Sequence, residues 1–398
     1  TFNTAFSRID NEREMKIAIL TQPLHTNYGG NLQNFALQTA LKKMGHDPVT
    51  IDRHRSIKVR TRLKLGYFKR LAFHYLKGME KPKLRDYFSK SKDKVDRVQV
   101  IRFIETYINK TPRLYSDLAV KKAFLDNKFD AVIVGSDQCW RPIYSPNINT
   151  YFLDFLENDQ SIQKITYAAS FGTDEWEFDE QKTQMAKKLI KQFDAVSVRE
   201  KQAVELVKNK LNSEASFVLD PTLLLDKEDY QTVINAHQPP LPKKQGVYTY
   251  VLDAGGWKGE VINKVSENFD AKVYNNQPKA TIENPSDNPD DYIIPSIEGW
   301  IKGFSDADFI VTDSFHGTVF SILFNKPFIS LLNSNRGASR FYSILSEFGL
   351  EDRLITHFDE TKINALLNQE IDWQKINEKL AILRKSSLSF LKKQVGLF

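Results

Sequence analysis

Short apolar runs alternate with helical patterns along most of the chain, and the clearest example lies at residues 308–332. Residues 309–311 form an apolar run of the kind that buried parallel strands show. The nearly all-apolar stretch 319–324 predicts a helix that is covered on most sides, and Pro327 ends it. Residues 328–332 predict a second strand, so the whole stretch predicts a βαβ unit.

The same alternation continues through both halves of the chain. The predicted strands are 16–20, 49–52, 129–134, 165–170, 193–198, 217–219, 246–252, 309–311 and 328–332. The main predicted helices are 32–44, 181–192, 203–210, 297–304, 319–324 and 373–395. Strands that alternate with helices indicate parallel sheets, so we predict an α/β protein with two Rossmann-like domains that face a cleft.

Residues 234–244 are the best candidate for a linker, because they contain three prolines between polar flanks. We therefore predict an N-terminal domain at 15–236, with a basic helical insertion at 53–127, and a C-terminal domain at 237–398. The last helix, 373–395, is predicted to pack back on the N-terminal domain. We interpret residues 1–14 as an upstream extension or an expression remnant, because Met15 leads directly into the first strand.

The composition is that of a water-soluble globular protein, with 41% hydrophobic residues among 398. No run of 18 apolar residues and no secretory signal is present, so we expect a cytoplasmic protein. The single cysteine, Cys139, allows no internal disulfide and no cysteine-based zinc site, which fits a reducing compartment. The chain lacks the HExxH, GxSxG and GxxxxGK[ST] patterns, so we expect no metal, no serine nucleophile and no cofactor.

The net charge of +6 is unevenly distributed, because residues 53–85 hold twelve basic residues and one acidic residue while the rest of the chain is net negative. Aromatic residues are interleaved with the charges, as in segments that lie on an anionic membrane surface. A polyanion is a second possible partner, and a solvated helix pair without a partner is the third interpretation. No nucleic-acid-binding motif accompanies the charge, so we expect no nucleic acid partner.

Polar residues follow the carboxyl ends of the predicted strands, where open α/β sheets bind their ligands. These residues are Gly29, Gly30, Asn31, Ser136, Asp137, Arg199, Asp313, Ser314, His316 and Arg336. Guanidinium groups bind carboxylate or phosphate in bidentate fashion, and histidine exchanges protons near neutral pH. The set indicates an anion-binding and proton-transfer site. Alternatively, Asp313 or Ser314 only caps a helix and His316 is incidental. We interpret the remaining histidines as surface or loop residues without a function: His25, His46, His54, His74, His237 and His357.

Five motifs, taken in order, resemble the polysaccharide pyruvyl transferase family. They are NYGGNLQ at 27–33, VGSD at 134–137, VSVRE at 196–200, DPT at 220–222 and TDSFHG at 312–317. The resemblance implies a fold similar to the GT-B glycosyltransferases. It also implies transfer of the pyruvyl skeleton of phosphoenolpyruvate to a sugar, with formation of a cyclic ketal and release of phosphate. The family's phosphoenolpyruvate contacts then fall on Arg199, His316 and Arg336, with Arg340 as a rival for the last position.

We predict the catalytic residues from this match as His316, Arg199 and Arg336, with His316 as the general acid and Asp137 or Asp313 as the acceptor of a hydroxyl proton. The predicted substrate-binding residues are Asn27, Gly29, Gly30, Asn31, Ser136, Asp137, Asp313, Ser314, Gly317 and Arg340. The predicted donor is phosphoenolpyruvate. The predicted acceptor is a lipid-linked glycan of a capsule or cell wall, met at the inner face of the membrane. The alternatives are a GT-B-type glycosyltransferase that uses a nucleotide sugar and a non-catalytic glycan- or polyanion-binding protein.

Overall fold

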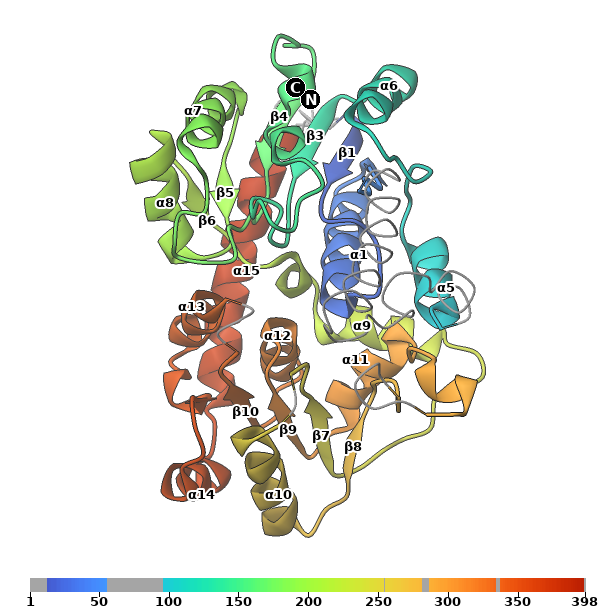
Figure 1. The fold of residues 1–398 in the computed structure, drawn as a ribbon, viewed down its shortest axis with the longest axis vertical. Coiled ribbons are helices and arrows are strands. Elements are labelled where there is room, and N and C mark those ends of the chain that lie inside the picture. Colours follow the sequence, from blue (N-terminus) through green and yellow to red (C-terminus); the bar gives the residue numbers. More distant parts are fainter. Residues whose placement is uncertain (1–12, 56–95, 254, 281–285, 334–336, 397–398) are drawn as a thin grey trace, which may run out of the picture.

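The computed structural model describes residues 13–55, 96–253, 255–280, 286–333 and 337–396, which form two α/β units (Figure 1). The N-terminal unit contains a parallel sheet in the order β2-β1-β3-β4. Its strands are β1 (Lys16–Leu20), β2 (Asp47–Thr50), β3 (Ala131–Val134) and β4 (Gln163–Thr166). Almost every strand residue is buried, because helices and loops cover both faces. This burial explains why the strands appear in the sequence as apolar runs and not as alternating patterns.

A short parallel pair, β5 (Ser197–Val198) and β6 (Ser216–Phe217), continues this unit beyond β4. Isolated parallel bridges, Ile165 to Ala195 and Ala169 to Val198, join the pair to the chain around β4. The pair is important for the site because Arg199 and Asp220 follow its two strands.

The C-terminal unit contains a five-stranded parallel sheet in the order β11-β10-β9-β7-β8. Its strands are β7 (Val247–Tyr250), β8 (Val273–Asn275), β9 (Phe309–Thr312), β10 (Phe328–Leu331) and β11 (Leu354–Ile355). The central strand β9 pairs with both β7 and β10, and its carboxyl end leads into the polar residues 313–317.

Helices cover both sheets. Those of the N-terminal unit are α1 (Tyr28–Lys43), α5 (Val98–Tyr107), α6 (Asp117–Asn127), α7 (Glu180–Leu189), α8 (Lys201–Leu211) and α9 (Lys227–Asn235). Those that follow are α10 (Trp257–Phe269), α11 (Ile297–Asp306), α12 (Phe315–Leu323), α13 (Ala338–Phe348), α14 (Glu360–Asn368) and α15 (Trp373–Val395). Short 3₁₀ segments in the described ranges are Ile148–Phe152, Asp154–Leu156, Ile190–Gln192, Pro221–Leu224, Pro289–Tyr292 and Glu351–Arg353. α5 and α6 are the described helices of the predicted insertion at 53–127.

A continuous apolar core joins the two units beside the cleft. It is built from α1, α9, α11 and α12, whose aromatic side chains meet between the sheets. The ring centroids of Tyr28 and Trp300 lie 5.8 Å apart, and those of Tyr230 and Phe320 lie 5.0 Å apart. The α9 helix ends just before the predicted boundary at 236/237, yet it packs with α11 and α12. The two units are therefore held together by apolar packing and not by the linker alone.

The long helix α15 runs along both units, as Figure 1 shows. Its Ile376 and Leu380 pack in the shared core, whereas Leu391 and Val395 pack against the N-terminal sheet. Arg384 donates hydrogen bonds to the carbonyls of Leu223 and Leu225. The helix thus connects the C-terminal unit to the N-terminal one.

Two helices begin earlier than the sequence pattern predicts, and both differences bear on the site. α1 begins at Tyr28 and not at residue 32, because the Asn27 side chain caps it by accepting from the Gly30 N–H. Gly29 and Gly30 therefore lie in the first helical turn and not in a connecting loop. α12 begins at Phe315, four residues before the apolar stretch at 319–324, because Ser314 caps it, as one interpretation of the sequence proposed. His316 is consequently part of the first turn of α12.

Some predictions fall on residues that the structure does not describe. These are most of the basic segment 53–85, the extension at 1–12 and Arg336. Within the described ranges, no helix has both the length and the apolar composition needed to cross a bilayer.

Candidate active site

The carboxyl ends of strands from both units surround a cleft of about 730 Å³, a volume within the usual range of small-molecule sites. The N-terminal unit contributes Gln22, Pro23, His25, Thr26, Asn27, His54, Arg55, Asp137, Gln138 and Tyr144 to its lining. The C-terminal unit contributes Tyr250, Leu252, Asp313, Ser314, Phe315, His316 and Arg340. Residues far apart in the sequence therefore meet at one cavity, as the strand-end pattern predicts.

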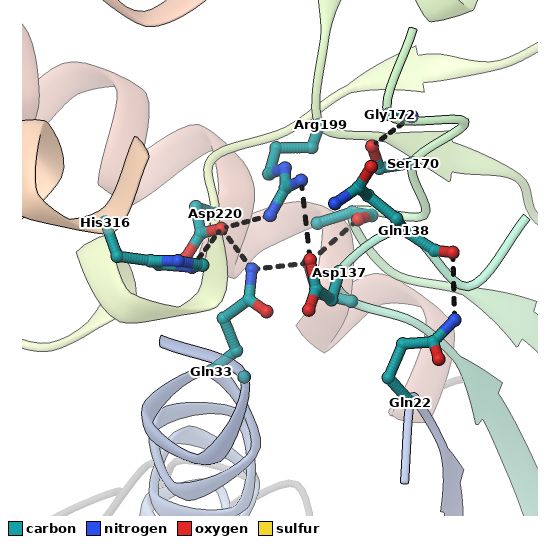
Figure 2. Close-up of polar contacts among 12 residues, drawn as sticks. Gln22, Gln33, Asp137, Gln138, Ser170, Gly172, Arg199, Asp220 and His316 are labelled. Carbon is teal, nitrogen blue, oxygen red and sulfur yellow. Dashed lines mark hydrogen bonds and ion pairs between the residues drawn. The ribbon is translucent and has the colours of Figure 1, made fainter. Parts of the chain in front are cut away.

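A buried charged network lies beside this cleft, and Figure 2 shows its side chains pointing toward one another. Arg199 Nη1 donates to Asp220 Oδ2 at 2.9 Å, and Arg199 Nε donates to Glu200 Oε1 at 2.9 Å. Arg199 Nη2 lies 3.9 Å from Asp137 Oδ1. The short strands β5 and β6 thus place the Arg199 guanidinium beside Glu200 and Asp220, and the loop after β3 adds Asp137; all three carboxylates are nearly inaccessible to solvent.

The same network reaches into α1 through Gln33, whose Nε2 donates to Ser136 Oγ at 3.2 Å and to Asp220. Asp220 also accepts from the N–H and the hydroxyl of Thr222 at 3.0 and 2.6 Å. The DPT and NYGGNLQ motifs therefore meet at Asp220, which the sequence interpretation did not include among the site residues.

His316 joins the two units at this point. Its Nε2 lies 3.7 Å from Asp220 Oδ2, so a carboxylate from the N-terminal unit provides a counter-charge for a histidine from the C-terminal unit. The ring lines the cleft and is 6% exposed. Its other nitrogen, Nδ1, lies beside Gly29: a Cβ at that glycine would be 2.0 Å from Nδ1. Gly29 is therefore required for the close approach of α1 to the imidazole and not for an unusual backbone conformation.

Phe315 separates two arginines. The Arg199 guanidinium carbon lies 4.6 Å from the centroid of the Phe315 ring, and that of Arg340 lies 5.5 Å from it. Both distances are those of cation–π contacts. Arg340 and Phe315 line the cleft, whereas Arg199 does not belong to its described lining and lies behind it. The three predicted residues Arg199, His316 and Arg340 are thus brought together, with Arg199 in a more interior position than the prediction assumed.

Burial and charge act in opposite directions on these groups. Burial alone would lower the pKa of Arg199, but the negative charges of Glu200, Asp220 and Asp137 raise its pKa above the ordinary value. Burial would likewise raise the pKa of Asp220, but His316, Arg199 and the Thr222 hydroxyl hold that pKa well below its usual range. Burial and the nearby Arg199 charge lower the pKa of Arg340 to about 10, so it stays protonated at neutral pH.

Asn27 and Asp137 form the N-terminal wall. The Asn27 side chain, besides capping α1, donates from Nδ2 to Asp137 Oδ2 at 3.4 Å. Asp137 is held in a left-handed backbone conformation with φ 61°, which directs its carboxylate toward Asn27 and Arg199. Gly30 lies next to both side chains, since a Cβ there would be 3.5 Å from Asp137 Oδ2.

Several predicted site residues have mainly structural contacts. Asp313 accepts from the N–H groups of Leu252 and Asp253, from Lys258 Nζ at 2.6 Å and from Asn333 Nδ2. Four donors leave this carboxylate little capacity to act as a base, so the geometry does not favour Asp313 as the proton acceptor.

Three more residues support the site from behind. Ser136 Oγ donates to the Ala168 carbonyl at 2.9 Å, and Asn31 Nδ2 donates to the His25 carbonyl at 2.6 Å. Gly317 leaves room for Thr312, because a Cβ there would be 2.1 Å from Thr312 Oγ1. Together with the cap at Ser314, these contacts hold the segments around the cleft in place, and the predicted ligand contacts of these residues stay predictions.

The described histidines of the remaining set lie in loops, as predicted, but their surroundings differ. His25 and His54 line the cleft, whereas His46 and His237 are buried. His54 follows strand β2, so its position after a strand end was the available signal. It was missed because a lone histidine a few residues beyond a strand has no motif around it.

Among the described residues, no three His, Cys, Asp or Glu side chains are arranged to hold a metal ion. The described part of the cleft therefore offers arginine, histidine and carboxylate groups for binding and proton transfer. Arg336, the third predicted catalytic residue, lies outside the described ranges.

Comparisons with known proteins agree with the fold and the motifs. A family model described as polysaccharide pyruvyl transferase matches residues 27–335. A putative UDP-N-acetylglucosamine 2-epimerase from Listeria monocytogenes is similar in structure, with a TM-score of 0.53 and 11% identity over 96% of each chain. A glycosyltransferase from Rickettsia africae ESF-5 has a TM-score of 0.51 and 10% identity, over 96% of this chain and 98% of that chain. A search of curated proteins finds no match. At these identities the structural likeness shows the fold alone, and it confirms the predicted GT-B-like pair of Rossmann-like domains.

Proposed function

The chain belongs to the polysaccharide pyruvyl transferase family, and we propose that it transfers the pyruvyl group of phosphoenolpyruvate to two hydroxyls of a glycan acceptor. The products are a pyruvate ketal and inorganic phosphate. Family membership supports a transferase that acts on a glycan. The observation that supports this donor is the group of Arg199, His316 and Arg340 around Phe315 at the cleft between the units.

The charges of these groups suit the donor. Phosphoenolpyruvate carries a carboxylate and a phosphate, and each can accept paired hydrogen bonds from a guanidinium. Arg340 lines the cleft and is protonated at neutral pH, so we assign it a direct contact with the donor. Arg199 is committed to protein carboxylates through Nε and Nη1, so we assign it mainly to the positive potential behind Phe315. Arg336 remains a further predicted contact.

Ketal formation requires a proton at C3 of the enolpyruvyl group and removes one proton from each of two hydroxyls. One of these protons ends on C3 and the other leaves with the phosphate. We assign His316 as the acid that protonates C3, because its ring lines the cleft and Asp220 faces its Nε2. Asp137 lines the cleft and is not saturated with donors as Asp313 is, so we assign it as one acceptor of a hydroxyl proton.

Phosphate release tests the proposal. The purified protein is incubated with phosphoenolpyruvate and a panel of synthetic galactosides, glucosides and mannosamine glycosides, and inorganic phosphate is measured. We expect release with at least one acceptor and a loss of at least 100-fold in His316→Ala, since general acid catalysis contributes about 10²–10⁴-fold. Near-normal turnover in a folded His316→Ala protein would remove His316 from the mechanism.

A glycosyltransferase that uses a nucleotide sugar is the second candidate, because the chain has the fold of the glycosyltransferase from Rickettsia africae. Thermal unfolding distinguishes the two functions, since a ligand that binds the native state raises the melting temperature. We expect phosphoenolpyruvate to raise it and UDP-sugars to leave it unchanged. The opposite result would favour the glycosyltransferase, and no effect of either donor would favour a non-catalytic binding protein.

We further propose that the acceptor is a lipid-linked intermediate at the inner face of the membrane, in capsule or cell-wall synthesis. The basic segment 53–85 supports this proposal, because clustered lysines and arginines attract anionic headgroups. Co-sedimentation with vesicles that contain phosphatidylglycerol, followed against salt concentration, tests it. Absence of binding at low salt would contradict the membrane contact but not the transfer reaction.

A further inference from the structure

A second histidine–carboxylate pair lies on the side of the same cleft that the N-terminal unit forms. His54 Nε2 is 2.7 Å from Asp52 Oδ1, and Asp52 is only 2% exposed. The same carboxylate accepts from the Leu24 N–H at 3.2 Å, and its other oxygen lies 3.7 Å from Arg113 Nε. These contacts hold the Asp52 carboxylate in place beside one side of the imidazole.

The His54 ring is held in place and open to the cleft. Its backbone N–H donates to the Leu114 carbonyl at 2.7 Å, and its ring centroid lies 6.0 Å from that of Tyr115. His54 lines the cleft, and within the described ranges Nδ1 makes no hydrogen bond. When Nε2–H donates to Asp52, Nδ1 carries a lone pair that can accept a proton from a ligand.

This side of the cleft suits a sugar. Arg55 Nη2 donates to the Ile143 carbonyl at 2.5 Å, so the chain after His54 lies beside the loop that carries Tyr144. Tyr144 also lines the cleft, and its ring packs on Arg141 with the guanidinium carbon 5.0 Å from the centroid. A partly exposed aromatic ring beside hydrogen-bonding groups provides an apolar surface and polar contacts together.

His25 is a third histidine that lines the cleft. Burial is the largest influence on its pKa, which is lowered, and the charges of both Asp137 and His54 also act on it. His25, His54 and Asp137 all line the cleft. The proposed reaction removes protons from two hydroxyls. Asp137 accepts one of these protons, so the second proton requires another acceptor.

We propose that His54, oriented by Asp52, is the second proton acceptor and marks the acceptor subsite of the cleft. This inference rests on the proposed transfer reaction. In the closing step the carbon–oxygen bond from C2 to phosphate breaks, the second hydroxyl oxygen forms its bond to C2, and the hydroxyl proton passes to His54 Nδ1. The phosphate takes up one proton from solvent and His54 returns one, so the overall balance of atoms and charge is kept. His54 is a catalytic residue in this step, and Asp52 is a positioning residue.

The test compares His54→Ala with the matched variant His357→Ala, which removes an exposed histidine outside the cleft lining. The assay uses phosphoenolpyruvate and the acceptor glycoside that gives the highest wild-type rate. We expect His54→Ala to lower the turnover rate by about 10²–10⁴-fold, the usual contribution of a general base. The KM for phosphoenolpyruvate and the melting shift that it produces should equal those of the wild type. Added imidazole should restore part of the rate in His54→Ala and have no effect on His357→Ala.

Asp52→Asn tests whether Asp52 acts on the reaction only by orienting His54. It should lower kcat in the wild-type background and change nothing further in the His54→Ala background, because the two residues act as one unit. A wild-type turnover rate in His54→Ala would overturn the inference. A loss of rate that imidazole does not restore would also overturn it, and so would a loss of rate accompanied by loss of the phosphoenolpyruvate-dependent melting shift. Failure of the wild type to release phosphate would instead overturn the proposed function itself.

Discussion

Gly29→Ala is the sharpest test of the contact between the two units. Gly29 lies in the first turn of α1, where alanine has no backbone strain and a helix propensity better by about 1 kcal/mol. The new Cβ, however, would lie 2.0 Å from Nδ1, 2.4 Å from Cγ and 2.6 Å from Cε1 of His316. Ordinary contacts begin near 3.4 Å, so the imidazole must retreat by about 1.4 Å.

The imidazole has little room for this movement. Its ring centroid is 5.1 Å from that of Phe315, and Asp220 lies on its Nε2 side. Overpacking of a filled site costs about 1–3 kcal/mol, which the gain in helix propensity partly offsets. The net destabilisation should therefore be at most about 2 kcal/mol. A displacement of about 1 Å at a reacting group costs about 10²-fold in rate, so we expect the turnover rate to fall by at least about 100-fold.

The assay is phosphate release from phosphoenolpyruvate with the preferred acceptor glycoside, combined with urea unfolding of the same preparation. The matched control is Gly259→Ala, a helical glycine in α10 where an added Cβ would meet nothing within 4 Å. This control should keep full activity and gain up to about 1 kcal/mol of stability. Wild-type turnover in a folded Gly29→Ala protein would refute the need for the present position of the His316 ring in the reaction.

Two further predictions concern the buried charges. Arg340→Met should raise the free energy of unfolding at pH 7 by about 1–3 kcal/mol, because the pKa of Arg340 is lowered to about 10 and its charge destabilises the folded state at every pH below that value. The same variant should lose the phosphoenolpyruvate-dependent melting shift. A lower stability in urea unfolding would show instead that Arg340 makes net stabilising contacts. Asp220→Asn should lose about 3–5 kcal/mol, since it breaks a buried ion pair with Arg199, although Glu200 and Asp137 remain beside the guanidinium. Because the pKa of Asp220 is lowered in the folded state, the stability that the Asp220 carboxylate contributes should be complete from about pH 5 to 8 and should decline as the pH falls below about 4. The difference in unfolding free energy between the wild type and Asp220→Asn should therefore shrink toward acid pH. A difference that grows toward acid pH in urea unfolding would contradict the assigned role.

The strands and the overall class were predictable because burial on both faces leaves a direct trace in the sequence. The apolar runs at 16–20 and 309–311 correspond to β1 and β9, and the helical pattern at 373–395 corresponds to α15. The ordered motifs also identified the family through their resemblance to it, and the family model matches residues 27–335. The start of α1 was predicted less well, since the Asn27 cap acts through side-chain geometry and not through hydrophobic period; the Ser314 cap of α12 was one of the two interpretations of its segment.

The sequence alone therefore determined which residues lie at strand ends, and hence that Asp137, Arg199 and His316 belong near a common cleft. Only the tertiary structure decided what surrounds each of them there. Arg199 is neutralised by carboxylates because two short strands place Asp220 beside it, and His54 becomes a candidate base because Asp52 is buried next to it. Such pairings depend on distances of a few ångströms between separate elements. No local pattern encodes these distances, because they result from how two sheets and a shared apolar core pack against each other.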